Sequence, residues 1–315
     1  MTAANDHNRL ALGLASLGRP GYINLGHSQD LGSIDYSAMQ ERCMDVLDAA
    51  YDCGIRHIDA ARSYGSAEDF LAGWMDRRRP DDLFISSKWG YRYTADWQIQ
   101  AEVHEVKDHS LSHLQSQWKE SHARLGSHIN LYQIHSATLK TGVLEDAAVL
   151  RFLSGLKEEG LRIGLSLSGI DQPATLDRAL EIRIDGMQLF DSVQATWNVL
   201  EQSVAPSLRS AHEAGWLVLI KEALANGRLT ERGDCDGFLA FARSKGVPPD
   251  ALALAYALSM PFVSRVLLGP TTREQLESNL AALQLRISQE DRAALDAMRE
   301  EPADYWNRRS RLAWN

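Results

Sequence analysis

The chain has 315 residues, of which 44% are hydrophobic and 24% are charged, and its formal net charge is −9. This composition is typical of a globular protein with one large domain or two modest ones. The acidic balance argues against nucleic acid or an anionic membrane as partner, and no apolar run approaches the roughly 20 residues that cross a bilayer. The sequence does not predict an oligomeric state.

The N-terminus and the cysteines point to a cytoplasmic protein. The first ten residues, MTAANDHNRL, have no basic flank followed by an apolar run, so we expect no signal peptide. Cys43, Cys53 and Cys235 are an odd set without the spacing of metal ligands. Reduced thiols in the cytoplasm are the simplest interpretation.

Short apolar segments alternate with amphipathic segments along the whole chain. The apolar segments predict strands at 10–18, 55–61, 83–89, 129–136, 162–169, 186–194, 216–224 and 264–269. Between them, apolar residues at three- and four-residue spacing predict helices, for example over 37–54, 111–126 and 149–160. No low-complexity linker divides the chain.

Strands that alternate with helices favour a parallel sheet with right-handed crossovers. The strand and helix units of this chain predict an α/β fold, a single-domain (β/α)₈ TIM barrel over residues 1–315. An open doubly wound sheet is less favoured, because the first strand is not followed by G-x-G-x-x-G. The phosphate-binding pattern G-x-x-x-x-G-K is also missing.

Polar residues gather where the predicted strands end, which is where a barrel of this kind has its working site. Asp59 and Tyr64 follow the second strand and Lys88 ends the third. His135 ends the fourth strand and Gln194 the sixth. A nearby ammonium lowers the phenol pKa from its reference value of about 10. We therefore expect a tyrosine that gives a proton to a carbonyl oxygen while a hydride arrives at the carbon.

Five segments, in chain order, resemble signature segments of the aldo-keto reductase superfamily: HIDAARSYGSAEDFLAGW, SSKWG, LYQIHS, DSVQATWNVLEQ and LLGPTTREQLESNL. The resemblance covers roughly residues 10–283. It implies an NAD(P)(H)-dependent enzyme that reduces an aldehyde or ketone, or oxidises the alcohol. Tyr64 would be the general acid/base, with its pKa lowered by Lys88. Asp59 would orient Lys88, and His135 would steer the carbonyl.

The resemblance also implies residues that hold the nicotinamide cofactor. Ser166 and Gln194 would hold the carboxamide of the nicotinamide. Around the adenosine phosphate and the adenine, the matching residues are Gly269, Thr271, Thr272, Arg273, Gln275 and Asn279. A helix that starts near Arg273 would offer free N–H groups to an anion. We expect NADP(H) rather than NAD(H), because Arg273 is a basic residue that pairs well with a 2′-phosphate.

The chain departs from the family pattern at two positions. Leu167 stands where the family usually has an asparagine, although Ser168 shares the strand direction of Ser166. Lys221 stands where the family commonly has a tyrosine that stacks on the nicotinamide ring. A lysine stem can cover the ring face but supplies no π-stacking. Its charge also favours the neutral, reduced nicotinamide.

Substrate contacts are expected from aromatic residues and from two segments beyond the barrel strands. The aromatic candidates are Trp89, Tyr91, Trp197 and Trp306. They favour a partly apolar pocket and, weakly, a ring-bearing substrate. The insertion at 92–110 is expected to carry selectivity, and the tail at 301–315 is expected over the active-site end.

Two other functions stay open from the sequence. Leu167 and Lys221 would suit a non-catalytic, nicotinamide-nucleotide-binding regulatory subunit of the same fold. His57 and Asp59 form an H-x-D pair that would suit a metal-dependent barrel hydrolase, but only His135 is a further histidine at a strand end. We therefore expect no metal site and a structural role for His57.

Overall fold

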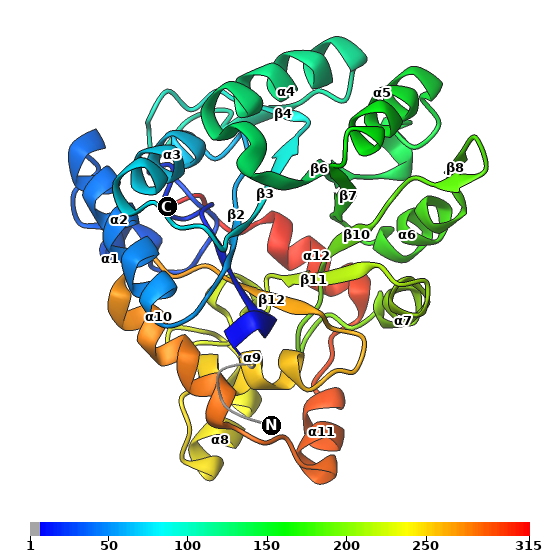
Figure 1. The fold of residues 1–315 in the computed structure, drawn as a ribbon. Coiled ribbons are helices and arrows are strands. Elements are labelled where there is room, and N and C mark those ends of the chain that lie inside the picture. The colour runs from blue at the N-terminus through cyan, green and yellow to red at the C-terminus, as the bar shows by residue number, and fades with distance from the viewer. Residues whose placement is uncertain (1–6) are drawn as a thin grey trace.

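Parallel strands close into a barrel, and helices surround it (Figure 1). The structure, a computed structural model, describes residues 7–315. The barrel strands are β1 (Leu10–Gly13), β2 (His57–Asp59), β3 (Phe84–Trp89), β6 (Ile129–Ala137), β7 (Arg162–Leu167), β10 (Ser192–Thr196), β11 (Leu217–Lys221) and β12 (Arg265–Leu268). They follow one another around the barrel in chain order, and β1 closes it by pairing with both β2 and β12. The predicted (β/α)₈ barrel is confirmed.

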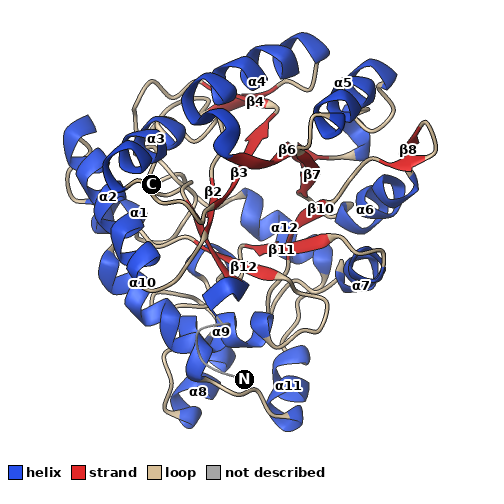
Figure 2. Ribbon diagram, viewed as in Figure 1, coloured by secondary structure: helices blue, strands red, loops and turns tan. Residues whose placement is uncertain are grey.

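The helices lie mainly outside the strands, as the blue ribbons in Figure 2 show. They are α1 (His27–Leu31), α2 (Tyr36–Asp52), α3 (Ala67–Arg78), α4 (Leu111–Leu125), α5 (Ala147–Glu158), α6 (Gln172–Glu181), α7 (Ala205–Glu213), α8 (Asp236–Lys245), α9 (Pro249–Leu258), α10 (Arg273–Leu280), α11 (Gln289–Asp296) and α12 (Pro302–Ser310). Ser110 and Asp146 cap α4 and α5 by accepting hydrogen bonds from backbone N–H groups in the first turns. Among residues 7–315, no helix combines the length and the apolar character needed to cross a membrane.

The barrel strands are apolar because both of their faces are buried. Leu10, Leu12, Ile58, Val193 and Ile220 each have 0% exposed surface. Buried polar residues are therefore exceptions within the strands. Most of those described below lie toward the carboxyl ends of the strands.

The sixth barrel strand begins later than predicted. The range 186–194 was expected, but β10 starts at Ser192, and Met187–Gln188 form β9 of a separate hairpin with β8 (Arg183–Ile184). The two residues between these strands, Asp185 and Gly186, have φ values of 49° and 80°. An Asp-Gly pair of this conformation is a typical two-residue hairpin turn.

Two segments beyond the barrel strands are also ordered. The insertion at 92–110 contains a hairpin of β4 (Tyr91–Tyr93) and β5 (Glu105–Lys107). The chain ends with α12 and a short extended segment. Asn315 exchanges two backbone hydrogen bonds with Tyr22, at 3.0 and 3.1 Å. This pairing ties the last residue to the loop that follows β1.

Candidate active site

A cavity of about 240 Å³ is lined by residues at the carboxyl ends of the barrel strands. The predicted site residues in its wall are Asp59, Tyr64, Tyr91, His135, Gln194, Lys221 and Gly269. They come from six different strands or the segments that follow them. The barrel therefore brings together side chains that are far apart in the sequence.

Close packing of two glycines fixes the backbone beneath Tyr64. The Ser66 backbone N–H donates to the Gly18 carbonyl oxygen at 2.7 Å. Gly65 has a φ of 61°, and a Cβ added there would lie 2.5 Å from the same oxygen. A Cβ on Gly18 would lie 2.2 Å from the Tyr64 carbonyl oxygen. Only glycine fits at these two positions, so the loops after β1 and β2 interlock and hold Tyr64.

Lys88 and Asp59 form a buried ion pair beside Tyr64. The Lys88 Nζ donates to Asp59 Oδ2. It also donates to the Ala60 carbonyl oxygen at 3.0 Å and to the Tyr64 hydroxyl at 3.3 Å. The Lys88 side chain has 0% exposed surface and that of Asp59 has 3%. Breaking such a pair leaves an uncompensated buried charge, so the pair fixes the position of the ammonium next to the phenol.

The other carboxylate oxygen of Asp59, Oδ1, also accepts several hydrogen bonds. Oδ1 accepts hydrogen bonds from Ser86 at 2.6 Å, Gln194 at 3.2 Å and Gln133 at 3.3 Å. His57 lies behind this group, with Nε2 at 2.8 Å from the Ser86 hydroxyl. His57 is 1% exposed. It supports Asp59 through Ser86 from beneath the cavity.

Tyr64 is a weak acid in this environment. Its pKa lies well above 10, first because burial penalises the phenolate and then because the Asp59 carboxylate is close. Arg19 opposes this rise, with its guanidinium carbon 5.5 Å from the ring centroid. The sequence predicted a pKa of Tyr64 lowered by Lys88, and this prediction is wrong, because burial and then the Asp59 carboxylate raise the pKa. Tyr64 therefore keeps its proton at neutral pH.

A bulge in β6 turns His135 toward the cavity. The pairing with β7 shifts register near the end of β6, where Ser136 has a φ of 51°. Bulges of this kind re-aim side chains next to active sites. The His135 Nδ1 lies 3.3 Å from the Ser63 hydroxyl. Burial, followed by the charge of Lys88, lowers the pKa of His135 well below 6.5, so the imidazole is neutral at pH 7.

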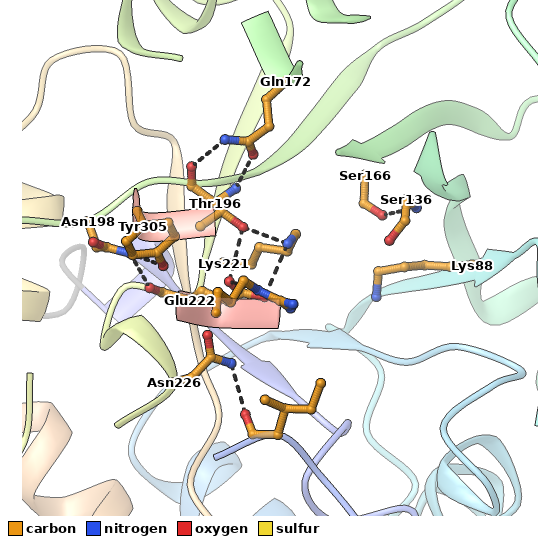
Figure 3. Close-up of polar contacts among 12 residues, drawn as sticks. Lys88, Ser136, Ser166, Gln172, Thr196, Asn198, Lys221, Glu222, Asn226 and Tyr305 are labelled. Atoms are coloured by element: carbon orange, nitrogen blue, oxygen red, sulfur yellow. Dashed lines mark hydrogen bonds and ion pairs between the residues drawn. The ribbon is translucent and has the colours of Figure 1, made fainter. Parts of the chain in front are cut away.

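The end of β7 presents a different serine from the one predicted to contact the cofactor. The Ser166 hydroxyl accepts a hydrogen bond from the Ser136 backbone N–H at 2.8 Å (Figure 3). Leu167 is 0% exposed and packs in the core. Ser168 lines the cavity. The hydroxyl that β7 offers to the cavity is therefore that of Ser168, with Ser166 behind it.

A second charged cluster lies at the end of β11 (Figure 3). The Lys221 Nζ donates to Thr196 Oγ1 at 2.7 Å and to Glu222 at 3.4 Å. Arg309, from α12, donates to both carboxylate oxygens of Glu222, at 2.9 and 2.5 Å. Burial alone would raise the pKa of Glu222, but Arg309 and Lys221 outweigh burial and hold it below its usual value. The cluster therefore joins the barrel to the C-terminal helix as an ionised group.

The loop after β12 begins at the cavity and runs to the start of α10. Gly269 lines the cavity, and no atom lies within 4 Å of a Cβ added there. The Thr271 backbone N–H donates to Gln275 Oε1 at 2.8 Å. The Thr272 hydroxyl caps α10 by accepting from the Gln275 backbone N–H at 3.3 Å. The predicted residues of this loop are thus brought together.

The remaining two predicted cofactor residues contact carboxylates. Arg273 has a 49% exposed side chain and lies 3.6 Å from Asp45 and 3.5 Å from Glu277. The Asn279 amide donates to Asp250 at 2.8 Å. Neither residue lies in the wall of the cavity described above.

Of the aromatic residues predicted to contact substrate, Tyr91 lines the cavity. Trp89 is 0% exposed and packs edge-on against a histidine ring. Trp197 is 2% exposed and stacks on a tyrosine ring at 5.1 Å. The structure does not place Trp89, Trp197 or Trp306 in the cavity wall. The tail instead supplies Trp314 there.

Several residues of the cavity wall were missed by sequence reasoning. They include Ser16, Arg19, Tyr22, Asn24, Glu105, Ser136, Glu222, Asn226, Arg309 and Trp314. Arg19 is 3% exposed, and its Nη1 donates to the Ser63 carbonyl oxygen at 2.9 Å and to Glu105 at 2.8 Å. Its guanidinium also lies 4.8 Å from the Trp314 ring centroid. The one signal that could have indicated Arg19 is its position directly after the glycine-containing apolar strand predicted at 10–18.

The part of the chain that the structure describes contains no group of three or more His, Cys, Asp or Glu residues arranged to hold a metal ion. In particular, both ring nitrogens of His57 already have partners. Nε2 contacts Ser86 and Nδ1 lies 2.9 Å from Arg265. His57 is therefore a structural residue.

Comparison with known proteins agrees with this geometry. Residues 9–300 match the sequence profile of the Aldo/keto reductase family. An uncharacterised oxidoreductase of Bacillus subtilis, YqkF, is 25% identical over 299 residues, which are 85% of this chain and 90% of that protein. The NADH-specific methylglyoxal reductase of Escherichia coli is 23% identical over 291 residues, with 82% and 87% covered. The structure of the holo form of aldo-keto reductase AKR11C1 from Bacillus halodurans superposes with a TM-score of 0.70 at 22% identity, covering 93% and 92%.

The chain belongs to the aldo/keto reductase family. Members of this family use nicotinamide cofactors. The relatives described as oxidoreductases or reductases span most of their own length in the match. The protein is therefore an oxidoreductase with the barrel of its family.

Proposed function

We propose that this protein reduces an aldehyde or ketone to an alcohol, with Tyr64 as the acid. The observation that carries the proposal is the contact of the Tyr64 hydroxyl with Lys88, which is held by Asp59, at the wall of a cavity that also contains His135. A phenol that keeps its proton at neutral pH suits an acid that gives it up only to a developing alkoxide. The reverse reaction, oxidation of the alcohol, uses the same groups.

The proton balance of the reduction is simple. The carbonyl carbon gains a hydride, which is the chemistry that a bound nicotinamide nucleotide supplies. The carbonyl oxygen takes the proton of the Tyr64 hydroxyl. The negative charge that then stays on the Tyr64 oxygen lies 3.3 Å from the Lys88 ammonium. Lys88 therefore stabilises the tyrosinate at the moment when it forms.

His135 suits the role of orienting the carbonyl. Its imidazole is neutral because burial and nearby cations lower its pKa. If Nδ1 accepts from the Ser63 hydroxyl, the ring proton is on Nε2 and is free to bond the carbonyl oxygen. The Tyr64 and His135 rings meet edge to face with centroids 5.5 Å apart. Two donors can thus converge on one oxygen.

Polar groups in the cavity wall support the proposal that it receives the nicotinamide end of the nucleotide. The amide of Gln194 and the hydroxyl of Ser168 lie in its wall, and we propose that they, with Ser166 behind, hold the carboxamide. Lys221 would cover the ring. Beyond open Gly269, the residues proposed for the adenosine phosphate and the adenine are Thr271, Thr272, Gln275 and Asn279. The sequence favoured NADP(H) because of Arg273, whereas one relative is described as NADH-specific.

We propose a substrate with an apolar, ring-bearing or short aliphatic body. Tyr22, Tyr91 and Trp314 supply aromatic surface to the cavity. A small molecule of this kind, in the cytoplasm, agrees with the net charge of −9 and with the free thiols of Cys43 and Cys235. The tail would shape the end of the cavity that receives the substrate.

The test is Tyr64→Phe, assayed with a panel of aliphatic, aromatic and sugar aldehydes and either reduced nucleotide. We expect turnover to fall by about 10²–10⁴-fold, while the Kd for the nucleotide, measured by tryptophan fluorescence, is unchanged. Tyr91→Phe is the matched control, since Tyr91 lines the same cavity without contacting Lys88, and it should retain most of the turnover.

Two results would contradict the proposal. Full turnover in Tyr64→Phe would remove the acid role from Tyr64. Tight nucleotide binding by the unaltered protein, without turnover of any carbonyl in the panel, would favour the nucleotide-binding regulatory function instead.

A further inference from the structure

The start of α10 is where a barrel of this kind commonly binds phosphate. Such sites are formed by the loops after the last two barrel strands and by the N-terminus of a nearby helix, whose free N–H groups attract an anion. Here these are the loops after β11 and β12, with Gly269 at the cavity and Thr272 capping α10. The charges that surround this point therefore bear on which nucleotide is accepted.

A carboxylate, that of Asp30 in α1, lies at this point. Gln275, in the first turn of α10, donates its amide to Asp30 Oδ2 at 2.7 Å. Arg232, from the loop after β11, donates to both Asp30 oxygens, each at 2.7 Å. The Asp30 side chain is only 10% exposed. Asp30 thus joins both loops of the expected phosphate site.

The surrounding backbone is built to hold Asp30 there. Gly26, directly before α1, has a φ of 77°, and a Cβ at this position would lie 2.2 Å from an Arg232 guanidinium nitrogen. His27 contacts the Thr271 hydroxyl through Nδ1 at 3.2 Å. The positive φ of Gly26 favours glycine, and the absence of a Cβ leaves space for the Arg232 guanidinium beside it. Asp30 is therefore fixed by α1, α10 and the loop after β11 together.

Two of the basic residues nearby already contact carboxylates. Arg232 has two of its nitrogens on Asp30. Arg273, on which the expectation of NADP(H) rested, lies beside Asp45 and Glu277 on the outer side of α10, about half exposed. The Asp30 carboxylate, which accepts a hydrogen bond from Gln275, therefore places a negative charge close to the expected phosphate position.

We propose that this protein binds NAD(H) in preference to NADP(H), and that Asp30 is the residue that discriminates between them. The inference rests on the proposed function, because it concerns the nucleotide of the same site. A carboxylate accepts a hydrogen bond from a ribose 2′-hydroxyl, which is how dinucleotide sites commonly select NAD. A 2′-phosphate at that place meets like charge in a partly buried setting and competes with Asp30 for Arg232.

The first measurement is titration of the unaltered protein with NADH and with NADPH, following tryptophan fluorescence. We expect NADPH to bind at least about tenfold more weakly than NADH, because the largely buried negative charge of Asp30 repels the 2′-phosphate of NADPH. Equal or tighter binding of NADPH overturns the inference and leaves the reductase proposal intact. If neither nucleotide binds at about millimolar concentration, both this inference and the reductase proposal are overturned.

The second measurement uses Asp30→Asn, which keeps the shape of the side chain but removes its charge and frees Arg232. We expect the ratio of the NADH and NADPH Kd values to move toward NADPH by about tenfold or more. Glu274→Gln is the matched control, because Glu274 is a carboxylate in the first turn of α10 that is exposed to solvent. Its removal should change the ratio by less than about twofold. Equal shifts in both variants overturn the role of Asp30.

A third measurement does not depend on any variant folding. The unaltered protein, with NADH bound, is titrated with 5′-AMP and with adenosine 2′,5′-bisphosphate, and displacement of NADH is followed by its fluorescence. We expect 5′-AMP to displace NADH at the lower concentration. More effective displacement by the bisphosphate contradicts the inference.

Discussion

Two charged clusters at the mouth of the barrel use the same kinds of residue but are built differently. Lys88 and Asp59 lie on adjacent strands and are 0% and 3% exposed. Lys221 and Glu222 lie at the end of β11, are 18% and 9% exposed, and depend on Arg309 from α12. The first cluster is complete once the strands pair. The second is complete only when the C-terminal helix has packed on the barrel.

The difference shows how the two clusters divide the work of the site. The strand cluster holds Tyr64, the proposed proton donor, and a shift of this residue would be most damaging to the proposed reaction. The β11 cluster links the barrel to the segment that carries Trp314 into the cavity. A second contact in the same segment, from the Asn198 amide to the Tyr305 hydroxyl at 3.0 Å, supports this link. We therefore expect the strand cluster to govern chemistry and the β11 cluster to govern the shape of the substrate end.

The largest effect is expected for Lys88→Met. It leaves the Asp59 carboxylate buried without its cation, and breaking a buried pair in this way costs about 3–5 kcal/mol. Urea unfolding followed by tryptophan fluorescence measures this loss. The double variant Lys88→Met/Asp59→Asn should recover much of it, since the uncompensated charge is gone. A loss below about 1 kcal/mol would mean that water reaches the pair.

Glu222→Gln should destabilise the protein by about 2 kcal/mol, the range for hydrogen bonds to charged groups. The change leaves Arg309 and Lys221 without their shared carboxylate. Glu145→Gln is a suitable control, because Glu145 also binds an arginine, Arg178, through two bonds of 2.6 and 2.9 Å but is exposed. That control should change the free energy of unfolding much less, because solvent screens an exposed ion pair. Equal losses would show that burial at β11 adds nothing.

The pH dependence should differ between the two directions of the reaction. Tyr64 is protonated below its pKa, which burial and Asp59 hold well above 10. Reduction needs the protonated form and should therefore stay level from neutral pH to about pH 9. Oxidation needs the phenolate, so its rate should rise by about tenfold per pH unit over the same range. A fall in the reduction rate centred near pH 7–8 would contradict the raised pKa.

The smallest effect is expected for the tail. Trp314→Leu removes aromatic surface from the cavity wall and should raise KM for a ring-bearing aldehyde by about fivefold, since an aromatic contact is worth about 1 kcal/mol. Trp306→Leu changes an indole of the same tail that lies outside that wall, and its KM should stay within about twofold. Equal changes in KM would mean that the tail acts through its packing on the barrel rather than through contact with substrate.

The barrel and the polar groups at its strand ends could be predicted from the amino-acid pattern. Alternating apolar and amphipathic segments specify strands and helices, and parallel strands place their carboxyl ends together. This is why Asp59, Tyr64, Lys88, His135 and Gln194 meet as predicted. The main error in the strands, at β10, arose from an Asp-Gly turn, a local signal that the apolar pattern concealed.

The rest of the cavity wall and its electrostatics depend on how distant parts of the chain pack together. Arg19, Glu105 and Trp314 come from a loop, the β4–β5 hairpin of the insertion and the tail, which lie outside the barrel strands. The raised pKa of Tyr64 is the sum of burial and several charges, which a motif does not contain. Asp30 contacts Arg232 and Gln275, which follow it by 202 and 245 residues in the sequence. Such long-range contacts depend on how complete elements pack, so no short segment of the sequence predicts them.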